Sequence, residues 1–427
     1  MKHKICLHGL GLKNKGQLLT AVQKLLPPST VKSKIKEKYL AHEDMLKYKR
    51  TRFVPLNEAG YKLTCINGVM VISDTIYPLN EVIIQYEEEA VQEVHKLLQK
   101  LLGGKMKFVL DEPDLVLRAK QQRGRSSMKD MEQYDEDDLA TALRCHLPWH
   151  VFGASKAWGD LLTCSNERNL VRQLRVKLRR LRSSLTFFKE LIPLTTFEQH
   201  KMLVKRWANV LGDAREYDVA LLTCMKIRHG QRTEEAVDEV SRLEEILLEY
   251  RARASKRVLN ASKLNGITLQ FAEMLLTLQN TALPEAYEDV RLKSFIRQRL
   301  NSWCNRLILL PEKYPDFADM EQLHKIRIKM KRFRYGLQGV PEIDFPTSLL
   351  RSLKSFQDML GFLHDDYVND MLIEEILQQY PDDPALQYEG AMFCGWERAK
   401  AEAALASLPE LWDNFTVQLR EWQEDTL

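Results

Sequence analysis

Two rows of basic side chains recur in this sequence at the spacing of one helix face. One row lies between residues 172 and 182 and the other between 324 and 334, each with cations at steps of three or four residues. A planar guanidinium can hold two oxygens of a phosphate at once, whereas lysine and protonated histidine act as point charges. These residue types predict non-covalent binding of an extended anion. The rows consist of Arg172, Arg175, Arg179 and Arg182, and of His324, Arg327, Lys331 and Arg334.

Both rows belong to one internal repeat. The segments that begin at Leu170 and Gln322 superimpose after a shift of 152 residues, and each row follows an apolar stripe by one residue. One residue is about 100° of helix rotation, so each row is expected to border the buried face. Other cations are expected on the exposed flank. The stripes are Val171, Leu174, Leu178, Leu181, Leu185 and Phe188, and Leu323, Ile326, Met330, Phe333, Leu337 and Val340; the flank cations are Lys177, Arg180, Lys325, Lys329 and Arg332.

Neither basic segment is interrupted by an acidic residue. Residues 168–189 and 324–340 contain no Asp or Glu. Like charges four residues apart on a helix cost roughly 0.2–0.5 kcal/mol, about what an opposite pair contributes. An ordinary solvated face would explain one such helix, but its recurrence in the same register favours a surface that receives an anion.

The repeat continues beyond the basic helices. Residues 205–219 match 354–368, and in each segment a lysine lies seven residues before the glycine of a Leu-Gly pair. Repeats of this length indicate a duplicated helical unit with pseudo-twofold symmetry and not a solenoid of short modules. The cations of these segments that join the candidate anion contacts are Lys205, Arg215 and Lys354.

These motifs resemble the CHAD family, the conserved histidine α-helical domain. The resemblance covers residues 139–427 and rests on R-V-x-x-R-R-L-R and L-G-x-x-R-x-x-D-V in the first half, and on L-H-x-x-R-x-x-x-K-R-x-R-Y and L-G-x-x-x-D in the second. It implies two four-helix bundles related by pseudo-twofold symmetry. It also implies binding of inorganic polyphosphate in a basic groove, often at polyphosphate granules.

The resemblance assigns phosphate contacts position by position. Arg172 departs from the pattern, because the family usually has a histidine there; this half keeps the charge but loses titration near neutral pH. The assigned contacts are Arg175, Arg179, Arg180 and Arg182, and His324, Arg327, Lys331, Arg332 and Arg334.

The residues before the helical part show a different pattern. Runs rich in β-branched and aromatic residues at 60–66, 68–73 and 81–86, with a helical run at 87–102, predict an α+β domain over residues 1–120. Residues 121–138 have few large apolar side chains and are expected to form a linker. The predicted fold class is therefore mainly α. It comprises a duplicated pair of four-helix bundles with pseudo-twofold symmetry, with halves of about 139–285 and 286–427, preceded by the smaller α+β domain.

The first domain resembles a degenerate CYTH, or triphosphate tunnel, domain. Segments 35–40, 46–52, 60–64 and 81–87 follow the strand order of that family. The E-x-E-x-K motif of the family is missing, because the segment from Lys4 to His8 stands at its position. Without those carboxylates we expect no metal site for triphosphate hydrolysis. We therefore expect a protein that is not an enzyme and uses no cofactor.

The composition limits the partners and the cellular compartment that we expect. With 63 Lys and Arg against 59 Asp and Glu, the net charge of +4 does not by itself imply a polyanion partner, so the placement of the charges carries the hypothesis. The seven cysteines form no C-x-x-C pair, which favours a reducing cytoplasm over a disulfide framework or a zinc site. We find no export signal and no apolar run long enough for a membrane span, and expect no membrane partner.

Three alternative functions stay open at this stage. A nucleic-acid-binding module would also use basic helices, although no aromatic residues interleave the rows. A module that binds phosphorylated or acidic proteins is the second alternative, and a triphosphate or polyphosphate hydrolase is the third. The expected partner is inorganic polyphosphate, and the sequence leaves the oligomeric state open.

Overall fold

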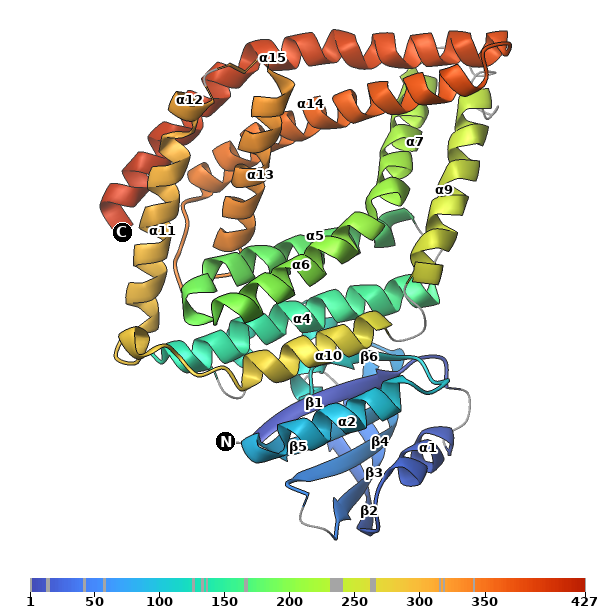
Figure 1. Cartoon of the computed structure of the whole chain (residues 1–427), viewed down its shortest axis with the longest axis vertical. Coiled ribbons are helices and arrows are strands. Elements are labelled where there is room, and N and C mark those ends of the chain that lie inside the picture. The colour runs from blue at the N-terminus through green and yellow to red at the C-terminus, as the bar shows by residue number, and fades with distance from the viewer. Residues whose placement is uncertain are drawn as a thin grey trace. The chain divides into compact units, whose positions relative to one another are not determined.

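The computed structural model divides into two compact units. The first comprises Met1–Val204 and Leu259–Val290, and the second Lys205–Val258 and Arg291–Leu427. The chain is mainly helical and begins with an antiparallel sheet (Figure 1), which confirms the predicted fold class. The structure describes residues 2–12, 16–40, 44–56, 59–124, 127–131, 134–135, 137–164, 168–230, 241–261, 266–314, 316–317, 319–340 and 342–426.

The N-terminal part of the first unit is a six-stranded sheet. Its strand order is β2-β3-β4-β5-β1-β6, and each neighbouring pair is antiparallel. Ser73 and Asp74 join β4 to β5 with φ of 46° and 64°, the positive values that a two-residue hairpin turn requires. The strands are β1 (Lys2–Gly9), β2 (Ser29–Tyr39), β3 (Met45–Pro55), β4 (Tyr61–Ile72), β5 (Thr75–Glu87) and β6 (Phe108–Asp111).

Two strands expected from the sequence, at 60–66 and 68–73, form the single strand β4. Gly68 lies inside it, where a Cβ atom would come within 2.1 Å of the carbonyl oxygen of Lys47 on β3. The glycine therefore permits a close approach of two strands and does not end one. The helix expected at 87–102 is confirmed as α2 (Val91–Leu102), which follows a short 3-10 turn.

Helices cover the sheet of the first unit and its β6 edge. The Tyr86 hydroxyl on β5 donates to Gln279 of α10 at 2.9 Å, and the Leu110 N–H on β6 donates to Ser155 of α4 at 2.7 Å. The helix α5 packs on α4. The remaining helices that belong wholly or partly to this unit are α1 (Gln17–Leu25), α3 (Leu115–Gln122), α4 (Leu139–Thr163), α5 (Arg168–Phe187), α6 (Leu194–Val210) and α10 (Gly266–Gln279).

The long helices of the second unit take part in two packing groups. At one end α7, α9, α14 and α15 share a core that includes Leu221, Leu247, Ile373 and Phe393. Further along, Phe356 of α14 stacks on Phe415 of α15, and α11 and α13 pack nearby. The helices are α7 (Gly212–Gly230), α9 (Arg242–Ala261), α11 (Leu292–Ile308), α12 (Leu310–Lys313), α13 (Met320–Leu337), α14 (Thr347–Gln379) and α15 (Pro384–Thr426).

The ranges 1–120, 121–138 and 139–427, with halves at about 285, stay predictions of domain organisation. Within the expected linker, Met128 is buried and Arg123 forms a 2.6 Å ion pair with Asp44. Among the described helices, none combines the length and the apolar character needed to cross a membrane.

Candidate functional site

The two apolar stripes are buried, as the sequence predicted. Every stripe residue of α5 and α13, with Phe188 and Val340 just beyond them, is at most 3 % exposed. The N-terminus of α13 is capped by Asp319, whose carboxylate accepts the Glu321 N–H at 2.8 Å. Near its other end, a Cβ at Gly336 would lie 2.4 Å from the Trp303 ring, so the glycine lets α11 approach closely. Packing of these faces orients both basic rows.

The basic rows lie at the margin of the buried faces. The row of α5 belongs to the first compact unit, whereas Lys205, Arg215 and the row of α13 belong to the second. The groove predicted to join the two rows stays a prediction. Of the candidate contacts, Arg172, Lys205, His324 and Lys354 are exposed, and Arg175, Arg179, Arg180, Arg182, Arg215, Arg327, Lys331, Arg332 and Arg334 are half-buried.

On α5 the basic side chains crowd one another. The Arg179 Nε donates to the Arg175 carbonyl at 3.3 Å, which folds this side chain back along the helix. Burial, together with the nearby Arg179 charge, lowers the pKa of Arg182. The like charge of Arg179 beside Arg182 makes this part of α5 a place where a bound anion would be stabilised.

The flank cations are less exposed than the sequence predicted. Lys177 is half-buried, since a Cβ at Gly153 of α4 would lie 3.6 Å from its Cδ. Burial lowers the pKa of Lys177, and the charges of Arg180 and Lys156 lower it further. The expectation of an exposed flank was wrong here because α4 packs along this side of α5.

The flank of α13 shows the same effect. Burial, then the charge of Arg332, lowers the pKa of Lys329, and Lys313 and Arg306 on α12 and α11 add to it. These last two cations were not singled out from the sequence. Lys329 and Arg332 are half-buried, so the predicted exposure was wrong for both; only Lys325 is exposed, and it forms a 2.6 Å ion pair with Glu321.

Residues of α14 hold the row of α13 in place. Arg327 has 14 % of its side chain exposed and lies 3.7 Å from the carboxylate of Asp365. Arg334 donates to the Gln357 side-chain oxygen at 3.1 Å, and the amide of Gln357 donates to the Met330 carbonyl at 2.6 Å. The row is therefore pre-organised by a neighbouring helix.

A pair of histidines lies at the start of this row. The Nδ1 atoms of His324 and His364 are 3.2 Å apart, and their ring centroids are separated by 4.9 Å. Both rings line a cavity of about 260 Å³, together with Arg327 and Tyr367. Sequence reasoning missed His364. The repeat holds the signal that could have found it, because His364 follows Gly361 by three residues, as the candidate Arg215 follows Gly212.

The histidine pair is neutral at neutral pH. Burial lowers the pKa of His364 to about 3, and the charges of Arg327, His324 and Lys331 contribute. Burial also lowers the pKa of His324, again with Arg327 and Lys331 as additional causes. An anion in the cavity would offset these cations and favour a proton on the pair.

Lys354 has a local partner. It forms a 2.8 Å ion pair with Asp358 one turn further along α14, and both side chains are exposed. Such pairs on a helix surface contribute a few tenths of a kcal/mol. The charge of this candidate contact is therefore already compensated by Asp358 on the same helix.

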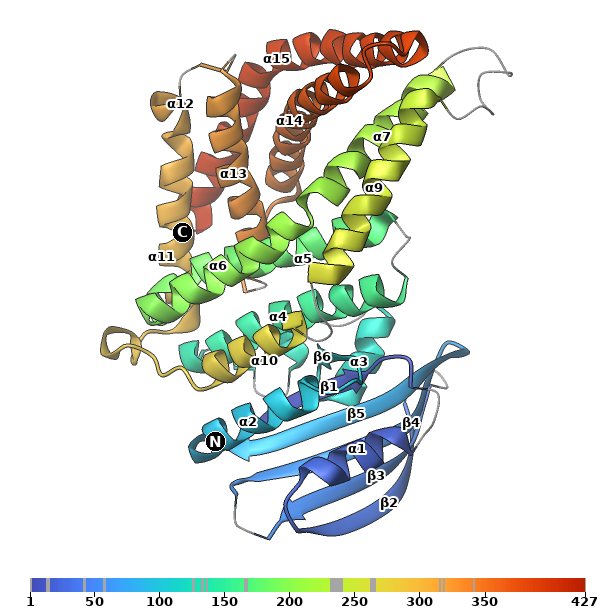
Figure 2. The same ribbon diagram turned by 45° about the vertical axis from the view of Figure 1, so that its right-hand side comes forward.

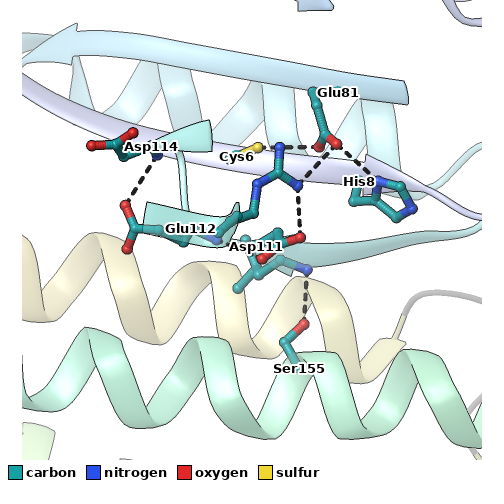
Figure 3. Close-up of polar contacts among 9 residues, drawn as sticks. Cys6, His8, Glu81, Asp111, Glu112, Asp114 and Ser155 are labelled. Carbon is teal, nitrogen blue, oxygen red and sulfur yellow. Dashed lines mark hydrogen bonds and ion pairs between the residues drawn. The ribbon is translucent and has the colours of Figure 1, made fainter. Parts of the chain in front are cut away.

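A buried polar network occupies the sheet of the first unit (Figure 3). Arg118 donates to Glu81 at 2.9 Å and to Asp111 at 2.7 Å, while His8 and Cys6 contact the same Glu81 carboxylate. Burial alone would raise the pKa of Glu81, but the Arg118 charge and the His8 hydrogen bond outweigh it and lower that pKa to about 2. His8 and Cys6 belong to the segment that stands in place of E-x-E-x-K. Where that motif would supply two carboxylates, this segment supplies a histidine and a cysteine, and the charge of Glu81 is compensated by Arg118.

Glu112 lies next to this network, and its pKa is shifted in the opposite direction to that of Glu81. Its side chain is 4 % exposed and accepts the Asp114 backbone N–H at 3.1 Å. Burial raises the pKa of Glu112 to about 7. Across the described residues, no group of three or more His, Cys, Asp or Glu side chains is arranged to hold a metal ion.

A family model for the CHAD domain matches residues 154–374, a range that contains both basic helices and both Leu-Gly segments. The chain belongs to the CHAD domain family. This match confirms the resemblance drawn from the motifs. The CYTH-like sheet precedes the matched residues, and its resemblance stays a prediction.

Two solved structures share the fold. The CHAD domain from the plant Ricinus communis is 21 % identical, with a TM-score of 0.53 over 66 % of this chain and 93 % of that one. PptA from Streptomyces chartreusis is 18 % identical, with a TM-score of 0.51 over 64 % of this chain and 99 % of that one. No curated protein matches in sequence.

Proposed function

We propose that this CHAD protein binds inorganic polyphosphate through the basic residues of α5 and α13. The observation that carries the proposal is that α5 and α13 each hold a row of cations along the margin of a buried apolar stripe. Burial and then the charge of Arg179 lower the pKa of Arg182 on α5, and burial and then the charge of Arg327 lower the pKa of His324 and His364 at the α13 cavity. Clusters of this kind hold positive charge whose repulsion a bound anion relieves.

An extended phosphate chain suits the shape of the rows. Cations three or four residues apart on a helix follow one another by roughly 5 Å along its axis. A chain with a negative charge on every unit can contact several of them at once, whereas orthophosphate reaches one or two. Arginine forks then hold pairs of oxygens, and lysines act as point charges.

The row of α13 is ready to bind without rearrangement. Arg327 and Arg334 are held by Asp365 and Gln357 of α14, so little side-chain entropy remains to be lost on binding. The contact with Asp365 leaves the guanidinium partly exposed to the cavity. An anion would join this arrangement as an additional acceptor.

Anisotropy of labelled polyphosphate, titrated with the full chain at several salt concentrations, tests the proposal. Long chains should bind more tightly than short ones, orthophosphate should compete poorly, and affinity should fall with salt as counterions are released. Arg327→Gln with Lys331→Gln should weaken binding, because each charge-assisted hydrogen bond contributes about 1.5–3 kcal/mol before screening. The exposed pair Lys400→Gln and Arg420→Gln on α15 is a control of equal charge.

Nucleic acid is the main competing ligand, and the same titration distinguishes it from polyphosphate. DNA or RNA oligonucleotides of matched charge should bind less tightly than polyphosphate. Equal affinity for both ligands, or for orthophosphate and long chains, would contradict the proposal.

We further propose binding without hydrolysis, and association with polyphosphate granules in the cell. Pure protein with magnesium or manganese should release no phosphate from triphosphate, ATP or polyphosphate above background. Phosphate release that survives extensive purification would reverse this part of the proposal.

A further inference from the structure

The two edges of the N-terminal sheet differ in what covers them. At the β6 edge, the Leu110 N–H donates to Ser155 of α4, and the Phe108 carbonyl accepts from Thr268 of α10 at 2.7 Å. The other edge is β2, an eleven-residue strand in which nine residues are exposed (Figure 2). Because β2 pairs only with β3, every second residue directs its N–H and C=O away from the sheet.

One face of this edge carries six cations, four of them on β2 opposite Leu46, Tyr48, Arg50 and Arg52 of β3. Side chains alternate along a strand, and residues directly opposite across an antiparallel pair share a face. Lys32 therefore lies beside Arg52, and Lys34 beside Arg50. Like charges directly opposite one another are destabilising. The cations on this face of β2 and β3 are Lys32, Lys34, Lys36, Lys38, Arg50 and Arg52.

Nothing in the described chain neutralises this basic face. None of its six cations has an ion pair or a hydrogen bond to another described residue through its side chain, and β2 and β3 place no acid on this side. Glu37, the one acid of β2, lies on the opposite face with Lys47. The charge is therefore available to a partner.

The opposite face of β2 is partly apolar. Val31 is 51 % exposed, and Ile35 and Tyr39 are each 72 % exposed. A long edge with open backbone groups and exposed β-branched side chains is a template for another strand. Lysines at such an edge repel a second copy of β2, so they restrict what can pair here.

We propose that β2 accepts an extended acidic segment of a partner protein as a seventh strand. Acidic side chains of that segment would alternate with apolar ones, the acids against the lysine row and the apolar residues beside Val31, Ile35 and Tyr39. Backbone hydrogen bonds supply affinity in this mode of recognition, and the alternating side chains supply specificity. A flexible polyanion without a peptide backbone would use only the lysines.

The test uses the full chain and a labelled eleven-residue peptide in which Glu alternates with Val and Thr. The peptide should bind and slow hydrogen exchange at the amides of β2. The same peptide with its backbone nitrogens methylated keeps every charge but cannot donate hydrogen bonds, and it should not bind. Lys32→Gln with Lys34→Gln should weaken binding roughly tenfold, whereas Lys47→Gln with Lys49→Gln, which removes the same charge from the other face, should have a much smaller effect.

A charge swap completes the design. Lys32→Glu with Lys34→Glu should lose the Glu peptide and gain a matching peptide in which Lys replaces Glu. Circular dichroism of each variant checks that the sheet is retained. If the methylated peptide, oligoglutamate of random conformation or short polyphosphate binds as tightly with the same dependence on Lys32 and Lys34, the face is a polyanion surface and the strand-addition proposal is overturned. No binding of the peptide would also overturn it.

Discussion

The Nδ1 atoms of His324 and His364 lie 3.2 Å apart and join the first turns of α13 to the middle of α14. At this distance one ring donates its Nδ1 hydrogen and the other accepts it, so the contact exists only while at least one ring is neutral. Burial, and then the charges of Arg327 and Lys331, lower the pKa of both rings. The pair is therefore sensitive both to pH and to any anion that enters the cavity.

The histidine pair should couple anion binding to proton uptake. The pKa of His364 is lowered to about 3 and that of His324 is lowered from its ordinary value near 6.5, so neither ring favours a proton in the free protein at pH 7. A bound polyanion favours the protonated form, and affinity should rise as the pH falls from 7 towards 5. Calorimetric titrations in buffers of different ionisation enthalpy should detect the proton that is taken up.

A variant and the free protein provide the controls for this coupling. His324→Gln with His364→Gln should flatten the pH profile without abolishing binding, because Arg327 and Lys331 are still present to contact the anion. The free wild-type protein should lose stability as the pH falls from about 6.5 towards 3, since the lowered pKa of His364 means that the unfolded chain binds the proton more readily. Identical pH profiles for the variant and the wild type would exclude the histidine pair as the source of the pH dependence of binding.

Gln357 should act on polyphosphate binding through the position of Arg334. Gln357→Leu removes the acceptor that holds the guanidinium but leaves the charge in place. We expect a loss of affinity with an unchanged slope of log K against log salt, because that slope counts the charges that contact the ligand. Arg334→Gln should lower both the affinity and the slope. A reduced slope for Gln357→Leu would show that the variant disturbs more than one cation.

The two basic rows should act on one long chain together. Arg175→Gln with Arg179→Gln, and Arg327→Gln with Lys331→Gln, should each weaken binding of long polyphosphate, and the quadruple variant should lose nearly all of it. Chains too short to contact both rows should instead bind each row separately. Each double variant should then halve the number of binding sites and leave the affinity of the remaining site unchanged. Stoichiometry from calorimetry distinguishes these outcomes. Loss of one row with no effect on long-chain affinity, in a protein that stays helical, would make the repeat architectural only.

Glu112→Gln should stabilise the protein at neutral and alkaline pH. The folded state raises the pKa of this carboxyl from its ordinary value near 4.5 to about 7, so its contribution is favourable below pH 4.5 and is lost as the pH rises through 7. A shift of this size corresponds to about 3 kcal/mol. Urea unfolding at pH 8 should show the gain, and at pH 4.5 the variant should equal the wild type. Equal stability at both pH values would show that Glu112 does not carry this penalty.

The sequence by itself determined the buried faces and the basic rows. Helical periodicity is a local property, so the spacing from Leu174 to Leu185 and from Ile326 to Leu337 was enough to predict which side of each helix is buried. Because the basic row recurs in the same register in both halves, the sequence favoured an anion-binding surface over an ordinary solvated one. The family motifs then predicted the CHAD fold. Local sequence patterns did not predict the role of Gly68, because the requirement for a glycine comes from the close approach of β3 and not from its own strand.

Only the tertiary structure decided what surrounds the rows. His364 approaches His324 across 40 residues of sequence, and Gln357 reaches Arg334 because α14 folds back along α13. Contacts of this kind depend on which helices pack together, and no periodicity within one helix encodes that choice. The same holds for Lys177, whose burial is set by α4, and for the network of Glu81 and Arg118, which forms only when β5 and α3 meet. Their charges and pKa values are properties of the folded chain.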